Sequence, residues 1–162
     1  MFEPDIVSLS QAVIAAAIAR GATLGTVESC TGGLVSGALT AVAGSSAAVD
    51  RGFVTYSNQA KTDLVGVDPA LIAAHGAVSE AVARAMADGA RERSGVDLAV
   101  SITGVAGPGG GSAEKPVGLV YFGLAGPDGV THRREAFGDL GRDEVRAAAV
   151  KIALTMLLEA LS

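Results

Sequence analysis

The chain has 162 residues, of which 49% are hydrophobic and 18% charged, and it carries a formal net charge of −5. This length favours one domain with a core that needs no crosslinks, and the apolar content excludes global disorder. One cysteine, Cys30, excludes an intrachain disulfide, two histidines argue against a histidine-rich metal site, and the acidic balance without a basic run argues against a nucleic-acid binder.

In chain order, the hydrophobic pattern predicts a helix at 8–20, a strand at 23–28, a helix at 33–43, a strand at 53–57, a helix at 58–65, a short helix after Pro69, a helix at 79–93, a strand at 96–103, strands at 117–125 and 130–137, and a helix at 142–161. Gly21 is a stop signal for the first helix, and Ser79 is a favourable N-cap. This order is typical of a layered α/β domain.

The connections between strands predict their directions. Helical crossovers join the first three strands, so we expect these to be parallel. No helix separates the last three, so the fourth strand is expected to run antiparallel to its neighbours. Ligands in such sheets bind at the carboxyl ends of the strands, where the glycine-rich segments after Glu28 and Thr103 are expected to lie.

The chain shows no targeting segment. The uncharged stretch 29–49 is long enough to span a bilayer, but its many Ser, Thr and Gly residues favour a loop, a helix and a second loop. The N-terminus is acidic, unlike a secretory signal. We expect a single domain over residues 1–162, cytoplasmic, with no membrane partner, and the alanine-rich helices favour a homo-oligomer.

The first segment with chemical potential is Glu28-Ser29-Cys30-Thr31-Gly32-Gly33, which follows a strand and opens a helix. Helix N-termini offer free N–H groups to an anion or an oxyanion, and Ser29 is expected to project from the strand end. The alternative is an ordinary capping turn. Cys30 is a rival nucleophile, but a small buried apolar residue is the favoured interpretation because free cysteines are usually buried.

The second segment is Thr55-Tyr56-Ser57-Asn58-Gln59-Ala60-Lys61. If Asn58 caps the helix, Tyr56 lies at the strand end, and Lys61 in the first turn could act as general base to a serine hydroxyl. An ordinary lysine, with a pKa of about 10.4, is almost fully charged at pH 7, so burial or a nearby cation would have to lower that pKa. The alternative is a solvated surface lysine.

The third segment, residues 103–112, is rich in glycine and is followed by Lys115-Pro116-Val117-Gly118. It lacks the P-loop pattern, and a strand rather than a helix follows it, which excludes a dinucleotide fingerprint. We interpret it as a loop that leaves backbone amides free for a ligand, with a flexible hairpin as the alternative. Arg142 and Arg146, one helical turn apart, could hold a phosphate or form a solvated face; His75 and His132 are interpreted as non-catalytic.

Five motifs occur together and in order: Glu28-Ser29-Cys30-Thr31-Gly32-Gly33, Thr55-Tyr56-Ser57-Asn58 with Lys61, Gly76-Ala77-Val78-Ser79, Thr103-Gly104-x-Ala106-Gly107-Pro108, and Lys115-Pro116-Val117-Gly118. Over about residues 8–160, the chain thereby resembles the C-terminal domain family of the competence/damage-inducible protein CinA. Stand-alone members of that family are nicotinamide mononucleotide (NMN) deamidases. The chain has no room for the N-terminal domain of the larger members, so it looks like the stand-alone form.

The resemblance implies a three-layer α/β/α domain with a mixed five-stranded sheet of order 2-1-3-4-5, strand 4 antiparallel. It also implies hydrolysis of the carboxamide of NMN to nicotinic acid mononucleotide and ammonia, in pyridine-nucleotide recycling, with no metal and no cofactor. The family's catalytic serine and lysine fall on Ser29 and Lys61, with Tyr56, Thr103 and Arg142 at the same site.

Within that hypothesis, Tyr56 and Thr103 are expected to orient Lys61 or to relay protons. The substrate is expected to contact a wider set of residues: Thr31, Gly32, Gly33, Asn58, Gly104, Gly107 and Arg142. Two alternatives stay open. One is a non-catalytic nucleotide-binding module of the same fold, and the other is an amidase for a different pyridine or nucleotide amide.

Overall fold

The computed structural model describes residues 1–162. The elements, in chain order, are α1 (Pro4–Arg20), β1 (Leu24–Glu28), α2 (Leu34–Thr40), the 3₁₀ turn η1 (Ser45–Ala47), β2 (Val49–Val54), α3 (Asn58–Val65), α4 (Pro69–His75), α5 (Glu80–Ser94), β3 (Leu98–Gly104), β4 (Leu119–Gly126), β5 (Gly129–Ala136) and α6 (Arg142–Ala160). No helix is both long enough and apolar enough to cross a membrane.

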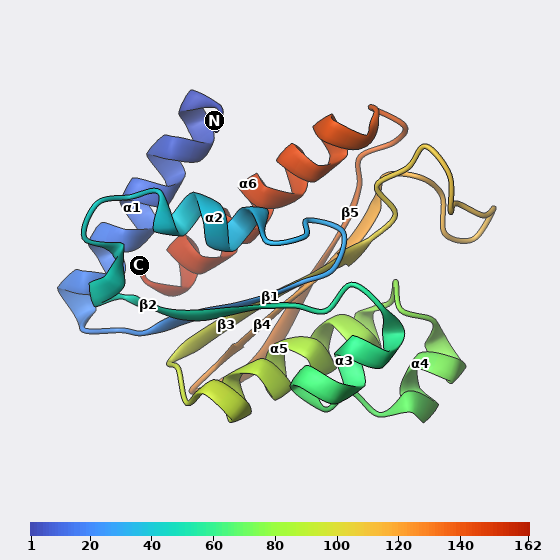
Figure 1. Ribbon diagram of the computed structural model, residues 1–162, viewed down its shortest axis with the longest axis horizontal. Helices are drawn as coiled ribbons and strands as arrows, with labels where there is room; N and C mark the ends of the chain where they lie inside the picture. The colour runs from blue at the N-terminus through green and yellow to red at the C-terminus, as the bar shows by residue number, and fades with distance from the viewer.

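The five strands form one sheet in the order β2-β1-β3-β4-β5. β1 pairs in parallel with β2 and β3, and β4 pairs antiparallel with β3 and β5. Helices α1, α2 and α6 cover one face of the sheet and α3, α4 and α5 the other, as Figure 1 shows. The predicted three-layer architecture, strand order and strand directions are therefore confirmed.

Each face of the sheet has its own apolar core. The larger one lies against α1, α2 and α6 and includes Val13, Phe122 and Leu154. The smaller one lies against α3, α4 and α5 and includes Val27 and Met86. Because helices cover both faces of the sheet, β1 is buried at every position and β3 at every position but its last.

The predicted position of the second strand is wrong. The sequence pattern placed it at 53–57, whereas β2 spans Val49–Val54 and the chain has left the sheet before Tyr56. β2 is an edge strand whose residues Asp50, Arg51 and Gly52 are exposed, so its first half lacks the apolar signal on which the prediction depended. α1 also begins earlier than predicted, because Pro4 occupies its first turn, where a missing N–H has no cost.

The cap of α3 differs from the expectation by one residue. Ser57, not Asn58, is the N-cap, and its hydroxyl accepts a hydrogen bond of 3.0 Å from the amide of Ala60. Lys61 consequently lies at the end of the first turn of α3. There it faces the sheet and not the solvent.

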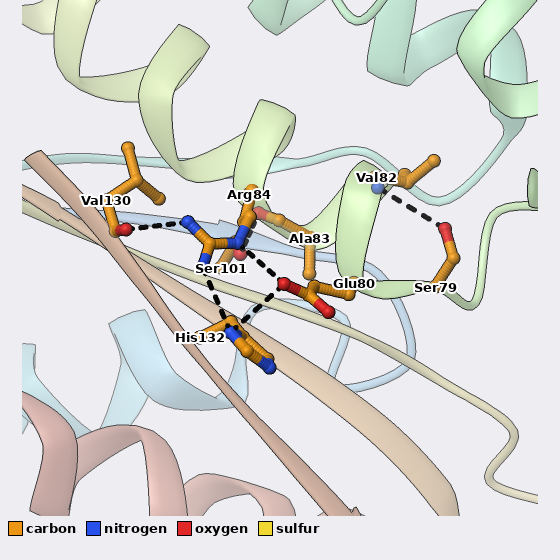
Figure 2. Close-up of polar contacts among 8 residues, drawn as sticks. All are labelled: Ser79, Glu80, Val82, Ala83, Arg84, Ser101, Val130 and His132. Carbon is orange, nitrogen blue, oxygen red and sulfur yellow. Dashed lines mark hydrogen bonds and ion pairs between the residues drawn. The ribbon is translucent and has the colours of Figure 1, made fainter.

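Hydroxyl groups fasten α5 to the middle of the sheet. The predicted N-cap Ser79 accepts from the amide of Val82 at 3.3 Å, and the Ser101 hydroxyl of β3 donates to the carbonyl of Ala83 at 2.6 Å (Figure 2). The Ser101 oxygen also accepts from the Gly123 amide of β4 at 2.9 Å. These contacts fix the start of α5 beside the carboxyl half of β3.

A charged cluster joins α5 to the edge strand β5 (Figure 2). Arg84 donates to the Val130 carbonyl at 2.7 Å and pairs with Glu80 at 3.0 Å. His132 Nδ1 lies 3.2 Å from both the Arg84 guanidinium and the Glu80 carboxylate. His132 therefore belongs to a surface cluster with Glu80 and Arg84 and forms no hydrogen bond to the glycine-rich segments.

Close helix packing at Gly89 supports the position of α3. A Cβ at Gly89 of α5 would lie 1.9 Å from the carbonyl oxygen of Val65, the last residue of α3. We expect Gly89→Ala to lower the free energy of unfolding by about 1–3 kcal/mol through overpacking, although alanine is intrinsically favoured over glycine in a helix by about 1 kcal/mol. Urea unfolding of the variant measures the change.

Asp88→Ala is the matched control for this prediction. Asp88 is the exposed neighbour of Gly89 on the same helix, so its replacement tests helix propensity without new contacts. We expect it to change the free energy of unfolding by less than about 0.5 kcal/mol. A Gly89→Ala protein as stable as Asp88→Ala would contradict the close contact between α5 and α3.

Candidate active site

Ser29 is placed at the carboxyl end of β1 by continuation of the sheet. Its amide donates to the Ile102 carbonyl of β3 at 2.9 Å, and the Thr55 amide donates to the Glu28 carbonyl at 2.9 Å. The sheet bonding therefore extends one residue beyond β1 and β2 on each side. Because side chains alternate between faces, Ser29 points away from α2 and towards the layer that contains α3.

Lys61 meets Ser29 from α3. Its Nζ lies 3.2 Å from Ser29 Oγ and donates to the Thr55 carbonyl at 2.8 Å. The side chain is 1% exposed and forms no ion pair. Burial lowers the pKa of the Lys61 ammonium below its ordinary range. The structure thus brings together a partly exposed hydroxyl and a buried amine whose charged form is destabilised by burial.

Glu28, the residue before Ser29, does not neutralise Lys61. Its buried carboxylate points to the opposite face of the sheet and accepts from the amides of Val35 and Ser36 at 2.8 and 3.0 Å. It therefore satisfies the first turn of α2, which has no side-chain N-cap of its own. This separation of the two charges keeps the desolvation of Lys61 uncompensated.

The turn of residues 29–33 presents backbone donors beside Ser29. Gly32 and Gly33 have φ angles of +57° and +100°, which L side chains rarely adopt. The Gly32 amide donates to the Ser29 carbonyl at 3.0 Å, so it is engaged within the turn. The amides of Cys30, Thr31 and Gly33 donate no hydrogen bond within the chain, and they are the donors available to an oxyanion.

Two arginines of α6 reach the strand ends. Arg142 donates to the Gly107 carbonyl at 2.8 Å and to the Tyr56 hydroxyl at 3.1 Å. Arg146 donates to the carbonyls of Cys30 and Thr31 at 3.1 and 3.3 Å. The first turns of α6 therefore connect all three segments that the sequence singled out.

The glycine-rich loop of residues 103–112 has the open backbone that its composition predicts. The amides of residues 106, 107 and 109–111 donate no hydrogen bond within the chain. Two hydrogen bonds hold the C-terminal end of the loop: the Ser112 amide donates to the Lys115 carbonyl at 2.9 Å, and Lys115 Nζ donates to the carbonyl of His75. The loop is therefore anchored at both ends while its central amides stay available.

Some predicted site residues occupy other positions than expected. The Thr103 hydroxyl donates to the Ala77 carbonyl at 2.9 Å, and Tyr56, 62% exposed, contacts Arg142; neither side chain is hydrogen-bonded to Lys61. Asn58 lines a hollow between α3 and α4, away from the Ser29–Lys61 pair. A Cβ at Gly104 would lie 2.8 Å from the Leu119 carbonyl, so close strand packing requires this glycine.

Thr55 is the residue that the sequence analysis missed. Its carbonyl holds Lys61, and its own hydroxyl is buried without a partner in the chain. No side-chain pattern could have identified it, because the contribution to Lys61 comes from the backbone. Glu28 was likewise not assigned its capping role, which depends on the tight turn at Gly32-Gly33 bringing α2 back over β1.

Cys30 is an unsuitable nucleophile in this structure. The side chain is 7% exposed and packs in the larger core, and burial raises the pKa of its thiol to about 12. The thiol therefore stays protonated at neutral pH, and the thiolate is the reactive form of cysteine. No three His, Cys, Asp or Glu side chains gather where they could hold a metal ion.

Comparison with known proteins gives consistent matches in sequence and structure. Nicotinamide-nucleotide amidohydrolase PncC from Escherichia coli is 52% identical over 160 residues, which cover 97% of this chain and 95% of that protein. The crystal structure of the competence/damage inducible protein CihA from Agrobacterium tumefaciens is 52% identical, with a TM-score of 0.96 over 99% of this chain and 98% of that chain.

A CinA-like protein from Mycolicibacterium gilvum is 55% identical over 147 residues, covering 91% of this chain but 35% of that protein. The chain spans 35% to 38% of the length of three such CinA-like relatives. A family model described as the CinA C-terminal domain matches residues 6–161. With nearly the whole chain matched, the protein belongs to the CinA C-terminal domain family.

Proposed function

We propose that the protein hydrolyses the carboxamide of NMN to nicotinic acid mononucleotide and ammonia, with Ser29 as nucleophile and Lys61 as general base. The observation that carries this proposal is the 3.2 Å contact between Ser29 Oγ and the Nζ of Lys61, a buried lysine that forms no ion pair. The choice of substrate is supported by the 52% identity to a protein named nicotinamide-nucleotide amidohydrolase. The reaction belongs to pyridine-nucleotide recycling.

The first half of the reaction forms an acyl-enzyme. Neutral Lys61 accepts the Ser29 proton while Oγ attacks the carboxamide carbon, and the carbonyl π electrons move onto oxygen. Free amides of the 29–33 turn donate to that oxyanion, which is worth about 3–4 kcal/mol per donor in comparable sites. The lysine ammonium then protonates the leaving nitrogen, so that the C–N bond breaks and ammonia departs.

The second half is hydrolysis of the acyl-enzyme. Lys61, neutral again, accepts a proton from water as the water oxygen attacks the acyl carbon, and the Ser29–acyl bond breaks with return of that proton to Oγ. Thr55 holds the amine in place through its carbonyl in both halves. The Lys61 amine thus handles every proton transfer: it exchanges protons with Ser29 Oγ, the attacking water and the leaving nitrogen.

The mononucleotide part of the substrate is matched by the surroundings of the pair. The open amides of residues 106, 107 and 109–111 lie beside the Arg142 guanidinium, which is bonded to the Gly107 carbonyl, and both groups favour a phosphate. Tyr56, exposed beside Arg142, offers a ring and a hydroxyl to the sugar or the base. Recognition of a phosphate distinguishes NMN from free nicotinamide.

The test of this function is ammonia release by the purified protein with EDTA present, comparing NMN with free nicotinamide. We expect release from NMN and a kcat/KM lower by at least about 100-fold for nicotinamide, since the phosphate contacts are lost. Equal rates for both compounds would indicate an amidase for other pyridine amides. Binding of NMN without any ammonia release would indicate a nucleotide-binding module instead.

Cys30→Ala tests the rival nucleophile. We expect this variant to keep the wild-type kcat within about threefold, because the thiol is buried and protonated while the chemistry uses the neighbouring hydroxyl. Initial rates of ammonia release from NMN provide the measurement. A loss of activity of 100-fold or more in a folded variant would reopen the thiol route.

A further inference from the structure

Arg146 has a different environment from Arg142, although both lie in the first turns of α6. Its Nε and Nη2 both point at the 29–33 turn, where they bind two successive carbonyls, those of Cys30 and Thr31. A Cβ at Gly32 would lie 3.5 Å from Arg146 Nη2, so the guanidinium packs directly over this turn. Arg146 thus contacts the backbone of the nucleophile segment and none of the reacting side chains.

The hydrogen bonds of this turn leave few donors for an oxyanion. The Ser29 amide is engaged by β3 and the Gly32 amide by the Ser29 carbonyl. The Thr31 amide is one of the remaining donors. It belongs to the Cys30–Thr31 peptide, whose carbonyl oxygen accepts a hydrogen bond from Arg146 Nε at 3.1 Å. In a trans peptide the N–H points opposite to the C=O. The Thr31 N–H therefore points away from α6, which lies on the other face of the sheet from α3, the helix that contains Lys61 (Figure 1).

A guanidinium on a peptide carbonyl also changes the donor at the other end of that peptide. Chains of hydrogen bonds polarise one another in a low-dielectric interior. A charged donor on the Cys30 oxygen draws electron density from the peptide and strengthens the Thr31 N–H as a donor. The second bond of Arg146, to the Thr31 carbonyl, restrains rotation of the Thr31–Gly32 peptide. It thereby also holds the orientation of the preceding Cys30–Thr31 peptide.

We propose that Arg146 is a positioning residue for the reaction: it orients and polarises the Cys30–Thr31 peptide so that the Thr31 N–H stabilises the oxyanion. This inference rests on the proposed function of Ser29. It replaces the interpretation of Arg146 as a phosphate ligand, because Arg146 is only partly exposed and both of its bonds go to the 29–33 turn, whereas Arg142 is exposed beside the glycine-rich loop. Phosphate binding is left to Arg142 and the glycine-rich loop.

The test compares Arg146→Met with Arg142→Met and Arg133→Met. Methionine keeps most of the aliphatic stem and removes the donors, and Arg133 is a partly exposed arginine paired with Glu159 near the end of α6. For Arg146→Met we expect kcat for NMN to fall about 10- to 100-fold with KM within about twofold, as when an oxyanion donor is displaced. Arg142→Met should chiefly raise KM, and Arg133→Met should leave both values unchanged.

Two further measurements separate positioning from folding. Guanidinium at millimolar concentration should raise the kcat of Arg146→Ala at least about tenfold. Arg146→Lys, which keeps a charged donor for one carbonyl, should have a kcat between those of the wild type and Arg146→Met. If Arg146→Met does not fold, these two arms decide the inference. Wild-type kcat in Arg146→Met, or a rise in KM alone, would overturn it, as would a failure of guanidinium to rescue folded Arg146→Ala.

A fluorophosphonate probe keeps this inference distinct from the proposed function. Attack of Ser29 Oγ on phosphorus forms an O–P bond and expels fluoride, and the phosphonyl oxygen takes the place of the oxyanion. If the wild type labels at Ser29 but releases no ammonia from NMN, the substrate assignment fails while the probe still tests Arg146. Labelling of Arg146→Met should then be about 10- to 100-fold slower; equal rates would overturn the inference.

Discussion

Ser29→Ala is expected to abolish ammonia release from NMN, with kcat reduced on the order of 10⁴- to 10⁶-fold, as in hydrolases whose nucleophile and base act as a unit. The physical reason is that Lys61 has no hydroxyl left to deprotonate, while the backbone donors of the 29–33 turn alone give little catalysis. Steady-state ammonia release, measured beside the wild type and with EDTA present, gives the result.

The variant should remain folded. Lys61 keeps its bond to the Thr55 carbonyl, and the sheet bond of residue 29 comes from its amide, which alanine also has. We expect the Tm to change by no more than a few degrees, and NMN to bind. Cys30→Ala, in the same turn, is the matched control that should stay active. A folded Ser29→Ala protein with more than about 1% of wild-type activity would remove Ser29 from the mechanism.

The sheet topology could be predicted from the sequence because long apolar segments and connection lengths determine it. The buried strand at residues 96–103 and the helical crossovers required a parallel centre, and the turn at Gly126-Pro127-Asp128-Gly129 required a hairpin. β2 was misplaced because edge strands do not need an apolar pattern. The expectation of a homo-oligomer stays a prediction, as no element of the chain tests it.

The site could be predicted only as far as side chains carry its signal. Ser29 and Lys61 are reactive or charged residues within the motifs, and Arg142 is a charged residue that the resemblance assigns to the site. The structure brings Lys61 to Ser29 and Arg142 to the neighbouring glycine-rich loop. The roles of Thr55, and of Arg146 towards the 29–33 turn, depend on backbone carbonyls, which every residue has. Which carbonyls meet Lys61 and Arg146 depends on how the strands and helices pack in three dimensions, and the hydrophobic periodicity of the sequence does not indicate it.

Lys61→Met is expected to lower kcat by about 10²- to 10⁴-fold, the usual contribution of a general base. It should also reveal the linkage between Lys61 and stability. Burial holds the pKa of Lys61 below its unfolded value, so the unfolded chain binds more protons between those two pKa values. Wild-type stability therefore rises with pH across that window, and below it the full cost of burying the charge is present.

Methionine removes this cost at every pH and also leaves the Thr55 carbonyl unpaired, which is a penalty that does not change with pH. The Tm of Lys61→Met relative to wild type should therefore be most favourable at low pH and become steadily less favourable towards pH 10. Thermal unfolding from pH 6 to 10 measures this trend. A Tm difference, variant minus wild type, that stays constant or rises with pH would contradict a depressed pKa at Lys61.

Lys151→Met provides the opposite case. Lys151 bonds Asp5 and Glu3 at 2.7 Å, and these carboxylates raise the pKa of its ammonium. Its removal should destabilise the protein by a similar amount from pH 6 to 9, since both the folded and the unfolded state keep that lysine charged there.

The lowered pKa of Lys61 also determines how activity depends on pH. Wild-type kcat/KM falls as pH drops below the depressed pKa of Lys61, because only the neutral amine can accept the Ser29 proton. That acid limb should be absent from the residual activity of Lys61→Met.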